Sequence, residues 1–451
     1  GEKNTAVGSG SLPANSTGSK NTAIGYLALQ SNTTADNNTA LGQEALKANT
    51  TGTENVAVGS GALDANTTAD NCVAVGFEAL GANTEANNNT GVGSKALLAN
   101  TTGAKNTAVG STALTVNTTG EENVAVGAFA LDANTSASDN TAVGYNCLGD
   151  NTTGVNNTAL GSNALLKNTT SNNNTAVGAS ALYINTTGAS NVAVGVNALD
   201  ANTTANNNTA VGNDALGANT TGTDNTSIGT GALQDSTTGD SNVAVGRLAL
   251  ENNTTASNNT AVGKSASASN TTGSDNTSVG TGALQANTTG ESNTCIGKDA
   301  GAASTDSNNT FIGRGAGHTL QSGSNNVCIG RDSITSSTSV SNEITLGNSS
   351  ITTLRCQTQT ISGLSDARDK TNIVDIADGL ELINNLRPRK FTWAMRQPSA
   401  NNGTTHLGFI AQELDQAIGS KNDYMHLVDK TNPNKLEAAY SRLIPILTKA
   451  I

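Results

Sequence analysis

Hydrophobic and polar positions recur over 1–347 with a step of 17. A five-residue word of the form NTAVG opens at Asn4, Asn21, Asn38 and Asn55, and it returns at the same interval up to Asn293. After one step that is shorter by a single residue, the series continues as NTFIG, NVCIG and EITLG from positions 309, 326 and 343. The chain therefore carries 21 copies of one short unit, which indicates a repeat architecture.

Each unit also repeats a glycine, a leucine and a second asparagine, which are Gly8, Leu12 and Asn15 in the first unit. The residues before the glycine are β-branched and alternate, which favours a short strand. Gly and Asn tolerate positive φ and mark corners. We predict that each unit forms one rung with two short strands and two turns. Stacked rungs would build a mainly β rod, a β-roll or β-helix, about 100 Å long at about 4.8 Å per rung.

The interior of such a rung is small. Val7 and Leu12 are the large aliphatic residues expected inside the first rung, and their burial does not offset the entropy lost when the backbone is ordered. The third position of the word is almost always small, as in Ala6, Ser227 and Cys295. Small residues allow chains to approach closely at a symmetry axis. Both features predict partner chains, and we expect a homotrimer.

The composition changes after the repeats. Aromatic residues form only 2% of the chain, yet five of the eleven lie within 365–451, together with four of the five prolines. We therefore predict a repeat shaft over 1–347, a linker over 348–364 and a small α+β domain over 365–451. Within this domain, the pattern predicts a helix over 378–386, a strand over 389–396, a helix after 407–414 and a C-terminal helix over 436–451, whose apolar spacing suits the start of a coiled coil.

Charge and hydropathy exclude several classes of function. The net charge is −12, and residues 1–350 contain 11 basic and 25 acidic residues. The shaft therefore lacks the basic footprint of a nucleic-acid-binding protein. No apolar run approaches the length of a transmembrane helix, which needs about 18 residues or more, and no signal peptide is visible. The chain begins with Gly1 rather than Met, which indicates a processed or partial chain.

The cysteines form no close pair of the kind that binds metal, so no metal or cofactor is predicted. We expect small buried hydrophobic residues, with interchain disulfides as the alternative. The N-T-T words match the glycosylation sequon, but Asn and Thr also suit turns and ladders. The cysteines are Cys72, Cys147, Cys295, Cys328 and Cys356.

Side chains that could bind or act on a glycan are scattered through the shaft. Exposed aromatic residues can bind sugars. Three directly follow the closing glycine of a unit and Phe129 lies one position further on; local packing over the rung edge is the alternative. The acidic residues Glu44, Asp64 and Asp132 occupy variable positions and do not form the carboxylate pair of a glycoside hydrolase. The histidines His318, His406 and His426 are isolated, which favours structural roles. The aromatic residues are Tyr26, Phe77, Phe129 and Tyr145.

Serine, lysine and other charged residues are clustered in the run GLSDARDKTNIVDI over 363–376, after a long stretch of repeats. A serine needs a base to become a nucleophile, and the nearest candidate to Ser365 is Lys370, five residues later. A lysine acts as a base only if burial lowers its ordinary pKa of about 10.4. A separation of five residues does not place Ser365 and Lys370 on the same face of a helix or of a strand. A turn or a neighbouring subunit must therefore bring them together. A solvated loop that exposes Asp366 and Arg368 is the alternative.

The C-terminal region resembles one family over residues 343–451. The run SGLSDARDKTNI, followed by LRPRKFTW, LGFIAQEL and YSRLIPILTKAI, is similar to the intramolecular chaperone and self-cleaving peptidase of phage tailspikes, endosialidases and long tail fibres, with related domains in myelin-regulatory-factor-like proteins. The resemblance implies a Ser365–Lys370 dyad, supporting charges at Asp366 and Arg368, and cleavage of the Leu364–Ser365 bond. It also implies a trimer with a C-terminal helical bundle.

The NTAVG words resemble those in the heads of trimeric autotransporter adhesins and in the shafts of viral fibres. Taken together, the resemblances imply a viral tail fibre or tailspike in the virion, assembled in the host cytoplasm. Its partners would be two further copies, other tail proteins and a host-cell receptor, without nucleic acid, cofactor or membrane insertion. Its enzymatic activity would be a single self-cleavage. The alternative is a bacterial surface adhesin or structural filament whose trimerising cap does not cleave.

Overall fold

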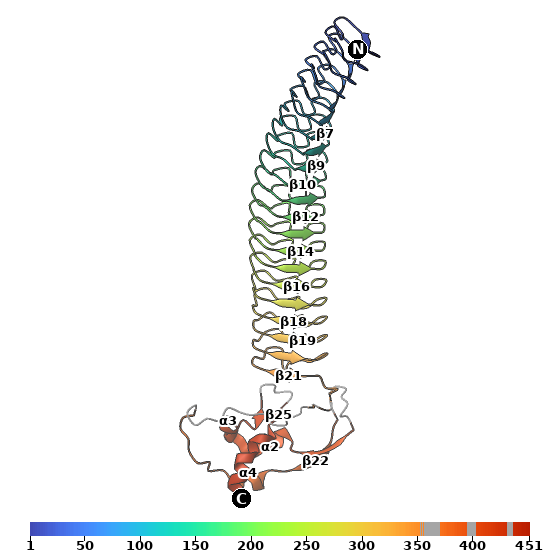
Figure 1. The fold of residues 1–451 in the computed structure, drawn as a ribbon. Helices are drawn as coiled ribbons and strands as arrows, with labels where there is room; N and C mark the ends of the chain where they lie inside the picture. The colour runs from blue at the N-terminus through green and yellow to red at the C-terminus, as the bar shows by residue number, and fades with distance from the viewer. Residues whose placement is uncertain (352, 354, 356–369, 395–402, 431–435) are drawn as a thin grey trace.

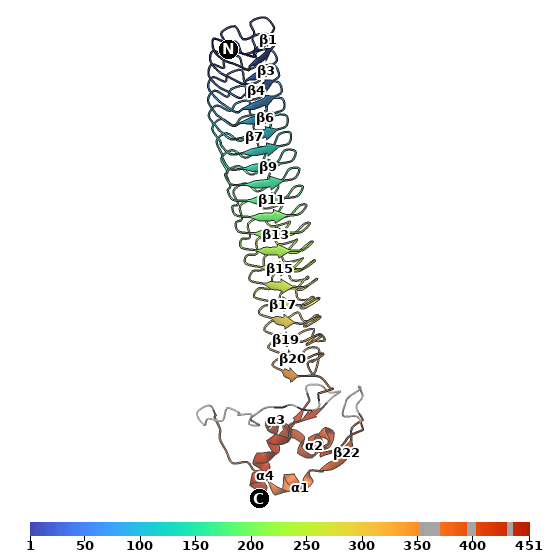
Figure 2. The same cartoon turned by 45° about the vertical axis from the view of Figure 1, so that its right-hand side comes forward.

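The protein consists of a long rod of stacked rungs and a small C-terminal domain (Figure 1). The computed structural model describes residues 1–351, 353, 355, 370–394, 403–430 and 436–451. Each rung contributes one strand of three residues, and each strand pairs in parallel with the strand of the next rung, so that Thr5 lies opposite Thr22. The strands form one stack along the rod (Figure 2). A parallel β-solenoid with 17-residue repeats is thus confirmed.

The 21 strands share the same position in the repeat. They are β1 Thr5–Val7, β2 Thr22–Ile24, β3 Thr39–Leu41, β4 Val56–Val58, β5 Val73–Val75, β6 Thr90–Val92, β7 Thr107–Val109, β8 Val124–Val126, β9 Thr141–Val143, β10 Thr158–Leu160, β11 Thr175–Val177, β12 Val192–Val194, β13 Thr209–Val211, β14 Thr226–Ile228, β15 Val243–Val245, β16 Thr260–Val262, β17 Thr277–Val279, β18 Thr294–Ile296, β19 Thr310–Ile312, β20 Val327–Ile329 and β21 Ile344–Leu346.

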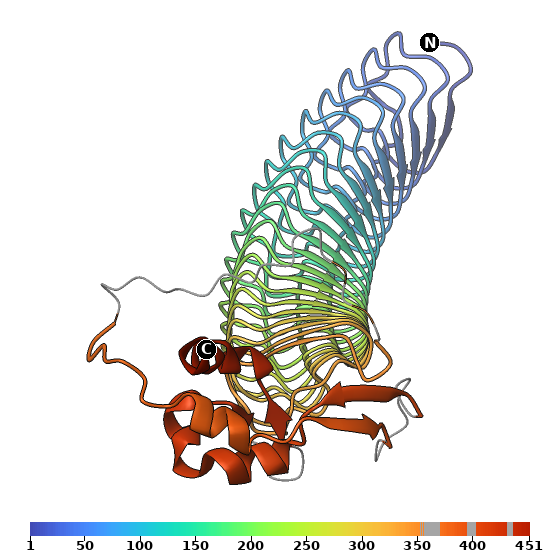
Figure 3. The same cartoon turned by 90° about the horizontal axis from the view of Figure 1, so that it is seen from below.

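The predicted second strand of each rung is wrong for the described shaft. The leucine of the unit adopts positive φ, as at Leu46 (φ 49°) and Leu131 (φ 53°), which ends extended structure. Backbone hydrogen bonds still join neighbouring rungs there, because the amide of Leu29 donates to the carbonyl of Ala45 at 3.0 Å. The strands therefore lie on one side of the rungs, and loops form the rest (Figure 3).

The predicted core is half right. The leucine that follows the closing glycine by four residues is fully buried in the rungs from Leu29 to Leu250, but the valine column lies on the outer face, with Val7 58% exposed. The small residue between them in the strand points inward, because successive side chains of a strand alternate, and Ala23 and Ala40 are fully buried. The small size of these residues predicted that they lie at a symmetry axis between chains. That prediction is wrong, because the Ala column fills the interior of a single chain.

Two asparagine ladders fill the remaining interior. In the first ladder, which includes Asn123 and Asn140, each side-chain oxygen accepts the backbone N–H of the next asparagine, here at 3.1 Å. In the second ladder, which includes Asn117 and Asn134, each side-chain amide donates to the asparagine of the preceding rung, here at 2.9 Å. These asparagines are fully buried. Their hydrogen bonds pair the buried polar groups and stabilise the interior within a single chain.

The second ladder contains the asparagines of the N-T-T words. Asn117, for example, also donates to the carbonyl of Gly120 at 3.0 Å. The interpretation that these asparagines serve turns and ladders is therefore confirmed. A buried side-chain amide that makes two hydrogen bonds cannot accept a glycan.

Ser236 interrupts the second ladder, and its repair should stabilise the rod. Asn219 Oδ1 and Ser236 Oγ are buried without a hydrogen-bond partner, since a serine is too short to reach the preceding rung. We expect Ser236→Asn to restore both contacts and to stabilise the local structure by about 1–3 kcal/mol, the cost of leaving buried polar groups unpaired. Hydrogen exchange of peptides spanning 219–253 should slow. The exposed Ser60→Asn is the control, and equal exchange in both variants would contradict the prediction.

The C-terminal domain has its own apolar core. Its elements are α1 Leu380–Asn385, β22 Arg389–Thr392, β23 Thr405–Gly408, α2 Ala411–Ile418, η2 Gly419–Lys421, α3 Asn422–Met425, β24 Val428–Asp429, β25 Glu437–Ala438, η3 Tyr440–Leu443 and α4 Ile444–Ala450. Leu382 of α1, Leu414 of α2 and Ile446 of α4 pack together with their neighbours. The helices α1 and α2 and the strand β22 lie where the pattern predicts them, although β22 ends at Thr392 and residues 395 and 396 of the predicted strand lie outside the described residues. The C-terminal helix is shorter than predicted and begins at Ile444.

Candidate self-processing site in the C-terminal domain

The predicted dyad lies at the start of the C-terminal domain. Leu364, Ser365, Asp366 and Arg368 are outside the described residues, so the structure tests neither their positions nor their roles. Lys370 is described, and its side chain is exposed in the single chain. The site can therefore be built only from Lys370 onward, on the elements that follow it.

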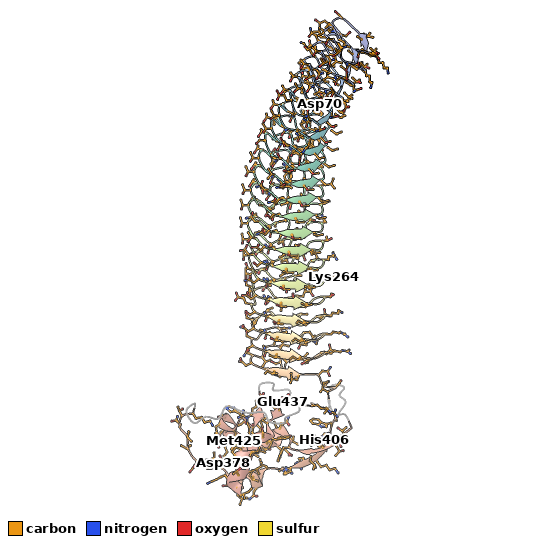
Figure 4. The ribbon with its side chains drawn as sticks, in the orientation of Figure 1. Asp70, Lys264, Asp378, His406, Met425 and Glu437 are labelled. Carbon is orange, nitrogen blue, oxygen red and sulfur yellow. The ribbon has the colours of Figure 1, made fainter. Side chains whose placement is uncertain are left out.

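Asp378 holds the segment after Lys370 to the rest of the domain. Its carboxylate accepts hydrogen bonds from Lys421 Nζ at the end of η2 and from the Tyr424 hydroxyl in α3. These bonds, that of Lys421 first, hold the pKa of Asp378 below its ordinary value, and the same bonds raise the pKa of Lys421 and of Tyr424. Asp378 and Met425 are labelled in Figure 4. This contact fixes where the chain enters α1.

The Asp378 contact makes an acid-dependent contribution to stability. A carboxyl group whose pKa is lowered by folding stabilises the folded state above its unfolded pKa of about 3.9, and this stability is lost as pH falls through the folded value. We expect Asp378→Asn to lower the melting temperature of the domain at pH 7 but not at pH 2. Trp393, the only tryptophan, reports on this domain selectively. If the melting temperatures of the wild type and Asp378→Asn differ equally at both pH values, the contact is not ionic.

A second ion pair joins the hairpin to α2. Arg389 of β22 donates to both carboxylate oxygens of Glu413, at 2.8 Å from Nε and 2.5 Å from Nη2. A bidentate pair of this kind fixes orientation as well as distance. It lowers the pKa of Glu413 and raises that of Arg389. The hairpin itself pairs Arg389 with Gly408 and Phe391 with His406. Ion pairs and hydrogen bonds thus hold together the elements of the domain that carries Lys370, around a small apolar core.

The other candidate residues are placed by the structure as follows. Tyr26, Phe77, Phe129 and Tyr145 are exposed, and the rings of Phe129 and Tyr145 contact each other edge to face at 5.9 Å. Local packing is therefore confirmed for this pair. Asp64 and Asp132 are partly buried, which raises the pKa of each carboxyl group.

The four described cysteines are buried and free, as expected, and Cys356 lies outside the described residues. Burial raises the pKa of Cys147 and Cys295 to about 12, which makes these thiols unreactive. Among the described residues, no cluster of His, Cys, Asp and Glu could hold a metal ion. None of the described helices has the length and apolarity needed to cross a bilayer.

Comparison with known proteins identifies the C-terminal domain. Residues 365–421 match the model of a family described as chaperone of endosialidase. No curated protein matches the sequence significantly. The match begins at Ser365 and extends through α1, the hairpin, α2 and η2. A chaperone-of-endosialidase domain thus follows a parallel β-solenoid, an arrangement that fits a phage tailspike-like protein.

Proposed function

We propose that this chain is a phage tail fibre or tailspike protein that attaches the virion to its host. The single observation that carries the proposal is the chaperone-of-endosialidase match directly after a long repeat rod. The rod displays the receptor-binding surface, and the C-terminal domain assembles the rod. The partners are two further copies of the chain, other tail proteins and a receptor on the host surface.

The family of the C-terminal domain implies a trimer. On the shaft, the outward column of strand residues is the apolar surface offered to partner chains. It runs along the stack, with Leu41, Ile228 and Ile329 each about two-fifths exposed. Because the rungs are nearly identical, three chains could align one rung out of step at small cost. We propose that the C-terminal domain sets the register before the shafts pair.

Self-cleavage would then release the assembled fibre. In this proposal, neutral Lys370 accepts the proton of the Ser365 hydroxyl, and the oxygen attacks the carbonyl carbon of Leu364. The same proton passes to the departing nitrogen of Ser365, and water hydrolyses the resulting ester. The supporting charges are Asp366 and Arg368. Burial by partner subunits favours the neutral amine, and since the Lys370 side chain is exposed in the single chain, cleavage would follow trimerisation.

Removal of residues 365–451 tests the assembly role. We expect the truncated chain to form monomers or aggregates, whereas the full chain forms a single trimeric species. Size-exclusion chromatography with light scattering distinguishes these outcomes. A clean trimer formed by the truncated chain would contradict the proposal.

A further inference from the structure

The basic residues in the C-terminal half of the shaft share one position of the repeat. Between residues 168 and 350 the chain contains five Lys and Arg residues, and all five directly follow the closing glycine of a unit. We call them the basic ridge. They are Arg247, Lys264, Lys298, Arg314 and Arg331. The other positions of the repeat contain no basic residue over this range, so the clustering is a property of one line along the rod.

The basic ridge is exposed and continuous. All five side chains are solvent-exposed, and Lys264 lies at the outer edge of the rod in Figure 4. The five residues occupy six consecutive rungs, with Thr281 in the remaining place. At about 4.8 Å per rung, they form a row about 24 Å long. The preceding glycine, such as Gly263 (φ +135°), turns the chain, so that the ridge lies beyond the corner of the strand face.

The charge of the basic ridge is only partly neutralised. Lys298 contacts Asp299 at 3.4 Å and Arg331 contacts Asp332 at 3.0 Å, each with its own neighbour in the chain. Over the part of the chain that the structure describes, no carboxylate lies within ion-pair distance of Arg247, Lys264 or Arg314. A row of cations creates a local positive potential that attracts anions, although the net charge of the shaft is strongly negative.

The same position carries aromatic residues nearer the N-terminus. Tyr26, Phe77 and Tyr145 also follow a closing glycine and are about half exposed. Elsewhere at this position, the rungs carry mainly Ser, Ala, Thr and other small or polar residues. One line along the rod thus carries three of the four exposed aromatic rings of the shaft and five of its cations. Aromatic rings bind the rings of sugars, and cations bind their acid groups.

We propose that the basic ridge binds a linear acidic polysaccharide laid along the rod. The regular spacing of the cations along the rod suits an extended polymer with acid groups at recurring intervals. A stacked nucleic-acid strand places one phosphate about every 3.4 Å, out of step with rungs about 4.8 Å apart. This inference deepens the attachment role proposed above and names the chemical class of the receptor.

The test compares two variants with the same change in net charge. The ridge variant replaces Arg247, Lys264, Lys298, Arg314 and Arg331 by Gln. The control variant replaces five other shaft lysines by Gln, namely Lys20, Lys47, Lys95, Lys105 and Lys167. Both sets are surface residues whose ion pairs contribute little stability, and equal melting temperatures verify folding. Binding of the full chain to polygalacturonate, dextran and a single-stranded DNA oligomer is measured at several salt concentrations.

We expect the wild type and the control variant to bind polygalacturonate but not dextran, with affinity falling as salt rises. The ridge variant should bind about tenfold or more weakly and show a shallower salt dependence, because it releases fewer counterions. Equal losses in both variants, or no binding by the wild type, would overturn the proposal. Tighter binding to DNA than to polygalacturonate would replace the polysaccharide with nucleic acid. Host adsorption that survives in the ridge variant would reject the ridge yet retain the attachment role.

Discussion

Gly212→Ala should open the middle of the rod. Gly212 has φ +141°, a conformation that residues with a side chain rarely adopt. A β-carbon at this position would lie 2.6 Å from the carbonyl carbon and 2.7 Å from the carbonyl oxygen of Gly229 in the next rung. Neither backbone atom can move without disturbing the ladder. We expect a loss of about 3 kcal/mol or more from strain and clash combined.

Gly217→Ala is the matched control for this prediction because it lies in the same rung. Its φ is not positive, and a β-carbon there would meet its nearest neighbour, Asp200 Oδ1, at 3.4 Å, an ordinary contact. Hydrogen exchange followed by mass spectrometry should show faster exchange across residues 195–245 in Gly212→Ala and unchanged exchange in Gly217→Ala. Similar protection in both variants would mean that the rungs adjust to a side chain at the corner.

Phe311→Ala should destabilise the C-terminal end of the shaft by about 3–5 kcal/mol, the usual cost of removing a buried aromatic ring. Phe311 is fully buried in β19, where most rungs carry Ala. Its ring fits because two leucines are missing around it, at Gly301 and Gly317. A β-carbon at Gly317 would lie 2.5 Å from Cδ1 of the ring. The ring therefore fills space that leucine fills in other rungs.

Because the Phe311 ring fills the space of a leucine at position 317, we expect the effects of substitutions at these two positions on stability to be strongly coupled. Gly317→Leu alone should destabilise the shaft through overpacking. Combined with Phe311→Ala, the same change restores the usual Ala and Leu of the repeat and should recover much of the lost stability, since leucine commonly has positive φ at this position. Melting temperatures of the four proteins give the interaction free energy. Additive losses would show that the two residues do not share one space.

The sequence predicted the repeat, its period and the stacking of its rungs, because Gly, Asn and Leu recur at fixed positions. It did not predict which face of the strand is buried. Val7 has more apolar area than Ala6, but the interior of a rung is narrow, and two asparagine ladders occupy much of it. Only residues as small as Ala fit beside the leucine. The second strand was also predicted wrongly, because a leucine at positive φ cannot be recognised from residue preferences.

The C-terminal domain was predicted from local patterns, and its polar contacts were not. Asp378 lies far from Lys421 and Tyr424 in the sequence, and the intervals between them reveal no contact. The basic ridge, in contrast, could have been found without a structure. Sorting Arg247, Lys264 and the other shaft cations by their position in the repeat places five of them in one column. The total charge of the shaft conceals this column.

We propose that the C-terminal domain assembles the fibre and then cleaves itself from the shaft. The most direct test of this proposal is the intact mass of the purified wild type beside Ser365→Ala. We expect the wild type to separate at the Leu364–Ser365 bond into two pieces, 1–364 and 365–451, while the variant stays whole and both shafts are trimeric. A wild type that stays whole as a trimer would contradict cleavage and leave a permanent trimerising cap.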